Sequence, residues 1–136
     1  MGELFINANN WCRHYRNKEG RKVAFSYGDR FLKRIYTDGE IEYCRGRAPQ
    51  LASRFAAKEA VMKALGTGIR GVGWRDVEVT RKRGMAPDIK LHGRAQKRAS
   101  QIGLKGLAIS LSHSKEFAVA SVIGESDKGN LVPINQ

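Results

Sequence analysis

The sequence predicts an α+β domain in which helices pack on an antiparallel sheet. Apolar residues recur at helical spacing over 29–65 and over 94–103, and the intervening and following segments alternate polar and apolar residues as strands do. The chain has 136 residues and only three prolines, which suits a single folded domain with one core. It contains no apolar run of membrane-spanning length.

The first two helices are expected over 29–36 and over 37–46. Apolar side chains recur at helical spacing in the first of these segments. The second begins with Thr37 and Glu40, which form a capping-box pattern.

The third helix should start near Pro49, which suits a first helical turn, and stop at Gly66. It contains "RFAAKEAVMKALGTG", in which Glu59 is the only carboxylate among Arg54, Lys58 and Lys63. The role of this lone acid is the main question that the sequence raises.

The second half of the chain should form two hairpins separated by a helix. The stretch "WRDVEVTRKRGMAPDIKLHG" has the pattern of strand, Gly/Pro turn and strand, and 94–103 returns to helical spacing. The stretch "LAISLSHSKEFAVASVIG" is rich in β-forming residues and should turn near 114–116. The tail over 125–136 has no periodic pattern.

The charge points to an anionic partner. Twenty-five Lys and Arg against thirteen Asp and Glu give a formal net charge of +12, which would attract nucleic acid, a phosphorylated small molecule or an acidic protein. Cys12 and Cys44 are isolated, so neither a zinc site nor a disulfide framework is indicated. With no signal-peptide pattern at the N-terminus, a cytoplasmic location is expected.

Glu59 and Lys63 lie four residues apart and so share a helix face with Phe55. They could form an exposed ion pair, or they could serve a magnesium-bound pyrophosphate, with the carboxylate on the metal and the ammonium on phosphate oxygens. The following Gly-Thr-Gly is not a P-loop, because its glycines end a helix instead of preceding one. It should act as a C-cap.

Ser112, His113 and Ser114 suggest a nucleophile and a base, but neighbouring side chains on a strand point to opposite faces. A serine hydrolase is therefore not expected. His113 would be either a half-buried structural histidine or a hydrogen-bond donor to a phosphate.

The helical motif, written here as "SRFAAKEAVMKALGTG", resembles the signature of holo-acyl-carrier-protein synthases, with Ser53 in place of the usual glycine. The segments "GWRDVEV", "IKLHGRA" after the Pro87 turn, and "LSHSKEFAVASVI" are similar to later parts of that family, in the same order. The resemblance extends from Gly28 to about Glu125.

This resemblance implies a 4'-phosphopantetheinyl transferase-like fold and a magnesium-dependent enzyme of fatty acid biosynthesis. Members of the family transfer 4'-phosphopantetheine from coenzyme A to a serine of apo-acyl carrier protein and release adenosine 3',5'-bisphosphate. They form homotrimers with active sites at subunit interfaces, and the carrier protein docks through an acidic helix. No membrane or nucleic-acid partner is implied.

The resemblance also implies roles for individual residues. Glu59 should bind magnesium and could act as the general base through a water, and Lys63 should approach the pyrophosphate. The remaining coenzyme A contacts would be Arg54, Gly66, Pro87, His113 and Ser114, and the carrier-protein contacts would be Arg30, Phe31 and Arg34.

The N-terminus departs from the family, which opens with a G-x-D-I-x-x-I strand whose Asp is the second magnesium ligand. This chain opens with "MGELFINANNWCRHYRNKEGRK", where no such strand is expected. Read one base later, the possible codons of residues 11–20 can encode "GVDIIEIKK". We infer an aberrant, out-of-frame segment over 1–27, a transferase domain over 28–125 and a flexible tail over 126–136; the alternative is a genuine, unusual N-terminus.

Two other functions remain open at this point. The chain could be an inactive or impaired form of the transferase, because it lacks the first metal-binding Asp. It could also be a basic RNA-binding module, although the basic segment 81–98 contains no aromatic residue and no RRM or KH signature.

Overall fold

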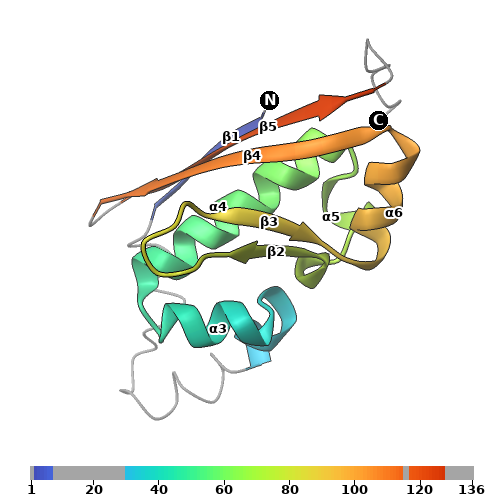
Figure 1. Ribbon diagram of the computed structural model, residues 1–136. Helices are drawn as coiled ribbons and strands as arrows, with labels where there is room; N and C mark the ends of the chain where they lie inside the picture. Colours follow the sequence, from blue (N-terminus) through green and yellow to red (C-terminus); the bar gives the residue numbers. More distant parts are fainter. Residues whose placement is uncertain (1, 8–29, 115–116, 128–136) are drawn as a thin grey trace.

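The computed structural model describes residues 2–7, 30–114 and 117–127, and the structural statements that follow concern these residues (Figure 1). It contains a three-stranded antiparallel sheet in the order β1-β5-β4, a separate β2-β3 hairpin, and helices packed against them. Figure 1 shows the long helix α4 running between the three-stranded sheet and the α3 side of the molecule. The predicted α+β class is confirmed.

The helical elements are α3 (Asp38–Cys44), α4 (Ala48–Leu65), α5 (Gly68–Gly71), the 3-10 turn η1 (Trp74–Asp76) and α6 (Gly93–Gln101). The strands are β1 (Gly2–Asn7), β2 (Val77–Thr80), β3 (Asp88–Leu91), β4 (Leu104–His113) and β5 (Phe117–Ser126). Residues 30–35 are also helical. Each helix and hairpin that the sequence predicts is present, whereas α5 and η1 were not predicted.

The N-terminal strand corrects the prediction that the first residues form none. Gly2–Asn7 forms β1, which pairs with β5 from Gly2 opposite Val122 to Asn7 opposite Phe117. The apolar run at its centre is short, so the sequence shows no alternation from which a strand could be recognised. Residues 8–27 of the predicted aberrant segment lie outside the described residues.

The end of β5 also differs from the prediction, because the strand continues through Ser126 instead of ending before 125. The Ser126 hydroxyl donates to the carbonyl of Ile102 at 2.7 Å, and the amide of Asp127 donates to the carbonyl of Gly103 at 2.8 Å. These contacts bring together residues distant in sequence, so no local pattern reveals them. Residues 128–136 of the predicted tail lie outside the described part of the chain.

Helix α4 is the centre of the core. Its buried side chains are mostly small, and they pack against β5, whose inward residues are Ala118, Ala120 and Val122. Small residues on both elements let the helix backbone approach the sheet closely. From Leu51 to Leu65, the positions that are not fully buried are Phe55, Glu59, Lys63 and Ala64.

A buried ion pair joins α4 to α3. Lys58 and Glu40 both have fully buried side chains, and Lys58 Nζ donates to Glu40 Oε1 at 2.7 Å. The same ammonium donates to the carbonyls of Trp74, at 3.0 Å, and Val77. Burial lowers the pKa of Lys58, and the attraction of Glu40 opposes this effect.

Both oxygens of the Glu40 carboxylate accept hydrogen bonds. It accepts from the amide of Thr37 at 2.9 Å, which completes the predicted capping box of α3. Its second oxygen accepts from the amide of Val79 at 3.1 Å. One carboxylate therefore ties the start of α3, the middle of α4 and β2 together.

Lys58→Met should lower the free energy of unfolding by about 3–5 kcal/mol, because it leaves the Glu40 carboxylate buried without a cation. Adding Glu40→Gln should recover part of this loss by removing the buried charge. Lys63→Met on the exposed part of the same helix is the control and should change stability by less than about 0.5 kcal/mol. Urea denaturation of the variants measures all three effects, and equal values for Lys58→Met and Lys63→Met would contradict the prediction.

Candidate functional site

The uncovered stripe of α4 carries the predicted catalytic residues. Phe55, Glu59 and Lys63 follow one another at intervals of four residues and therefore lie along one helix face. Glu59 and Phe55 are half-buried and Lys63 is exposed, whereas most other positions of α4 are buried. Phe55 stacks on Trp74 with ring centroids 4.8 Å apart, which fixes one end of this stripe.

The Gly-Thr-Gly sequence ends α4 and shapes the loop beside this stripe. Gly66 has a φ of 71° and its amide donates to carbonyls of the preceding turn, as the predicted C-cap requires. Gly68 has a φ of 59°, again in the left-handed region that glycine adopts without strain. Between them, the Thr67 amide donates to the carbonyl of Met62 at 3.1 Å.

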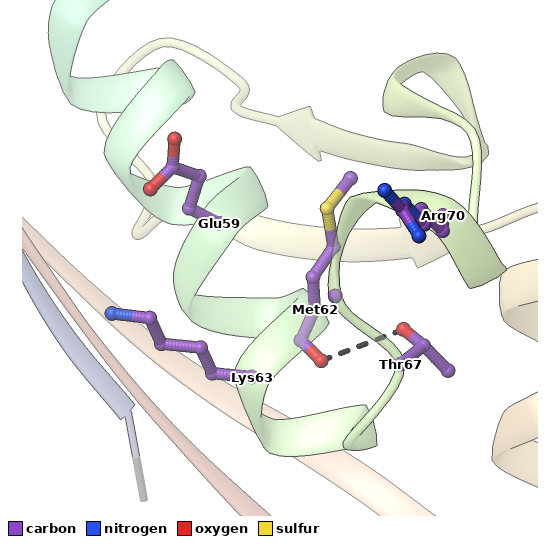
Figure 2. Close-up of a pocket in the computed structure, with 6 residues that line it drawn as sticks. Glu59, Met62, Lys63, Thr67 and Arg70 are labelled. Atoms are coloured by element: carbon purple, nitrogen blue, oxygen red, sulfur yellow. Dashed lines mark hydrogen bonds between the residues drawn. The ribbon is translucent and has the colours of Figure 1, made fainter. Parts of the chain in front are cut away.

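These elements surround an open pocket of about 470 Å³, within the size range of small-molecule sites. It is lined by Glu59, Met62, Lys63, Thr67, Gly68 and Arg70. Figure 2 shows Glu59 and Lys63 projecting from successive turns of α4 to the same side, with Met62 between Glu59 and Arg70 in this view. A half-buried carboxylate and two cations thus share one pocket.

Glu59 and Lys63 do not form the simple surface ion pair that their spacing allows. No ion pair within 4.0 Å joins Glu59 to Lys63 in the part of the chain that the structure describes. Burial raises the pKa of Glu59 above its ordinary value, and the nearby charge of Lys63 only partly offsets this increase. The carboxylate is thus available to a ligand, and its ionised form is destabilised by burial.

Glu59→Gln should therefore stabilise the metal-free protein at neutral pH. A carboxyl whose pKa is raised on folding contributes stability below its unfolded pKa, and this contribution is lost as the pH rises through the folded pKa. The gain in unfolding temperature should be largest near pH 7–8 and should shrink toward pH ~4. Thermal unfolding in the presence of a chelator tests this, and a pH-independent gain would contradict it.

Arg54 and Lys58 face away from the pocket. Arg54 is 3% exposed, its guanidinium lies 4.6 Å from the centre of the Tyr43 ring, and Nη1 contacts the Ser53 hydroxyl at 3.2 Å. Its buried Nη2 has no hydrogen-bond partner among the described residues. The sequence places both cations close to Glu59, but neither of them lines the pocket among the described residues.

Three other predicted coenzyme A contacts also lie away from this pocket. Pro87 is half-buried in the turn between β2 and β3, and His113 and Ser114 are exposed at the end of β4. The interpretation of His113 as half-buried is wrong: its side chain is exposed, whereas Ile109 and Leu111 on the same strand pack against a buried hydrophobic cluster. Figure 1 shows the turn after β2 and the end of β4 at one end of the molecule, and α5 and α6 at the other.

The predicted carrier-protein contacts share one exposed surface. Arg30, Phe31 and Arg34 lie on the helical stretch 30–35, and Phe31 is 39% exposed. The next residues on the inner side, Ile35 and Tyr36, are buried. We call Arg30, Phe31 and Arg34 the basic docking surface.

The pocket offers one carboxylate to a metal. No cluster of three or more His, Cys, Asp or Glu side chains occurs among the described residues. Magnesium usually keeps several waters and is held by one or two carboxylates together with substrate phosphates. The donor set therefore fits a magnesium ion that arrives with a phosphorylated substrate, with Glu59 as its protein ligand.

The sequence interpretation missed Met62 and Arg70 as pocket residues. It connected Thr67 and Gly68 with the site only as part of the Gly-Thr-Gly segment after Lys63. Met62 resembles any core position of α4, and α5 has only four residues, too few for a periodic pattern. Arg70 could have been suspected from its place just after the Gly-Thr-Gly, since a cation there faces the same loop.

The chain is similar to proteins of one known family. The profile of the ACPS family, described as the 4'-phosphopantetheinyl transferase superfamily, matches residues 17–122. The holo-acyl-carrier-protein synthase of Koribacter versatilis is 52% identical over 103 residues, which are 73% of this chain and 82% of that protein.

Solved structures show the same fold. Helicobacter pylori holo-acyl-carrier-protein synthase in complex with coenzyme A has a TM-score of 0.74 at 26% identity, covering 91% of this chain and 98% of that one. The Bacillus anthracis synthase in complex with CoA (3',5'-ADP) has a TM-score of 0.67 at 32% identity, covering 93% and 95%. Within the described residues, none of the helices combines the length and apolar character that a membrane crossing requires.

Proposed function

Because the chain belongs to the 4'-phosphopantetheinyl transferase superfamily, we propose that it transfers 4'-phosphopantetheine from coenzyme A to a serine of apo-acyl carrier protein. The other product is adenosine 3',5'-bisphosphate, and the reaction belongs to fatty acid biosynthesis in the cytoplasm. The observation that carries the proposal is the pocket that Glu59 and Lys63 line from the uncovered stripe of α4.

In the proposed reaction, the carrier serine oxygen forms a bond to the phosphorus of the phosphopantetheine group. The bond between that phosphorus and the oxygen of adenosine 3',5'-bisphosphate breaks. Lys63 and Arg70 supply positive charge to the pyrophosphate oxygens, which gain charge as the leaving group departs. Magnesium, when bound with coenzyme A, would neutralise the same oxygens.

Glu59 has two proposed roles. Its carboxylate holds the metal, and it accepts the serine proton through a water. Burial raises the pKa of Glu59, which moves a carboxylate toward the range in which a general base works well near neutral pH.

The distribution of the predicted contacts supports a homotrimer. The pocket lies beside α5. The turn after β2, which contains Pro87, and the end of β4, which carries His113, lie at the other end of the molecule (Figure 1). They could hold the nucleotide of a coenzyme A bound in the pocket of a neighbouring copy. On β5, Phe117 and Ile123 are 50% and 55% exposed on the sheet face turned away from α4, which offers apolar surface for such contacts.

The direct test is a labelling assay with purified protein, coenzyme A, magnesium and apo-acyl carrier protein. Mass spectrometry of the carrier protein should show addition of one phosphopantetheine group on its serine. A carrier in which that serine is replaced by alanine should remain unmodified. Absence of labelling, with a family member labelling the same carrier in parallel, would contradict the proposed function of this chain.

The basic docking surface should affect the carrier protein more than coenzyme A. Arg30→Glu together with Arg34→Glu should raise the KM for acyl carrier protein by about tenfold or more, because charge reversal opposes encounter with an acidic helix. The KM for coenzyme A should change by less than about twofold. The exposed Lys97→Glu on α6 is a charge-matched control, and equal changes in both KM values would exclude a separate docking role.

We further infer that residues 1–27 result from out-of-frame translation and that the chain as written is an impaired enzyme. Residues 1–16 lie outside the family match, which supports this inference for that part of the segment. Residues 17–27 lie inside the match, which argues against an out-of-frame origin for them. The pocket residues that the structure describes include a single carboxylate, Glu59. Magnesium would then depend more strongly on the phosphates of coenzyme A for its ligands.

A further inference from the structure

We propose that Arg98 on α6 is a positioning residue that holds one wall of the pocket and thereby increases the affinity for coenzyme A. This inference rests on the proposed function. Arg98 is half-buried, and its Nε donates to the carbonyl of Leu65 at 3.0 Å. Leu65 is the last residue of α4, at the start of the loop that lines the pocket.

The carbonyl of Leu65 needs a partner from outside its own helix. The last carbonyls of an α-helix have no intrahelical donor, and the amides of Gly66 and Thr67 donate to earlier residues of α4. Arg98 supplies the donor. Its positive charge also stands at the end of α4 where the helix dipole is negative, which strengthens the contact.

Helix α6 is fixed at both ends, so Arg98 reaches Leu65 from a rigid base. At its start, the amide of His92 donates to the carbonyl of Asp76 at 2.7 Å. Just after its end, the carbonyl of Gly103 accepts from the amide of Asp127 at 2.8 Å. Arg98 therefore holds the end of α4 in a fixed position relative to α6.

The loop after Leu65 supplies three of the pocket residues, namely Thr67, Gly68 and Arg70. Arg98 itself does not line the pocket. Without its hydrogen bond to Arg98, the Leu65 carbonyl would turn toward water. The loop would then be less ordered in the free protein, and the ligand would have to order it on binding. Loss of such preorganisation weakens binding before it affects the chemical step.

Arg98→Met tests this, because it keeps the apolar stem and removes the donor and the charge. Lys97→Met, an exposed neighbour on the same helix, is the matched control. In calorimetric titrations with coenzyme A, Arg98→Met should raise Kd by about three- to tenfold, which is within the range for one ordinary intramolecular hydrogen bond. The kcat at saturating coenzyme A and the KM for carrier protein should stay within about twofold of wild type.

A merely structural role would lower the unfolding temperature without changing Kd at temperatures where the variant is folded. Should Arg98→Met fail to fold, Arg98→Lys replaces it and is expected to give a smaller increase in Kd. A wild-type Kd in a variant that is folded would overturn the inference while leaving the proposed function intact. Failure of the wild-type protein to bind coenzyme A would overturn both.

Discussion

Glu59→Gln should lower the turnover number of carrier labelling by about 10²- to 10³-fold while the protein remains folded. The amide keeps the shape of the side chain but can neither accept the serine proton nor bind magnesium as an anion. The loss cannot be attributed to unfolding, because the same substitution should raise the stability of the metal-free protein at neutral pH.

Two measurements make this prediction specific. The magnesium concentration required for half-maximal rate should rise in Glu59→Gln, and Glu42→Gln, which removes an exposed carboxylate on α3, should leave both rate and magnesium requirement unchanged. An unchanged magnesium requirement in Glu59→Gln would remove this residue from the metal site. An unchanged turnover number would remove it from catalysis altogether.

Replacing residues 1–25 by the frame-corrected segment should raise turnover by orders of magnitude, because it returns a second carboxylate to the magnesium site. The sequence alone also suggested that the replacement would restore a missing strand. That part no longer holds, since Gly2–Asn7 already pairs with β5. The expected gain is now in rate and magnesium affinity instead of in a recovered strand.

The matched control is the same corrected segment with asparagine in place of its new aspartate. If the aspartate provides the second ligand, only the carboxylate form should gain rate and bind magnesium more tightly. Equal activity of the corrected, asparagine and written chains would refute the frame-shift hypothesis as an account of function. Glu3, Glu19 and Asp29 would then be tested as the second ligand.

The elements predicted correctly have strong local patterns. Thr37 and Glu40 form the predicted capping box, and Gly66 is the predicted left-handed cap of α4. The common face of Glu59 and Lys63 follows from helical spacing alone, and the pocket contains both residues. These features depend on neighbours in the chain, which a sequence displays directly.

The features that the sequence did not reveal depend on what covers each residue. Lys58 and Glu59 are adjacent, yet one is buried against Glu40 and the other lines a pocket, because α3 covers only one face of α4. The contact of Arg98 with Leu65 joins residues 33 positions apart, and no pattern around either residue indicates it. Such facts become visible only when the helices are placed in space.

The anchoring of the helical stretch 30–35 has a consequence for the choice of carrier protein. The hydroxyl of Tyr36, directly after this stretch, donates to the carbonyl of Leu51 on α4 at 2.6 Å, and the Lys58–Glu40 pair fixes α3 to the same helix. The basic docking surface is thus anchored to the helix that carries Glu59. If this surface binds the carrier protein, as we propose, its distance from Glu59 would select among carriers. A carrier whose serine does not lie at a matching distance from its acidic helix would be rejected even if its charge were suitable.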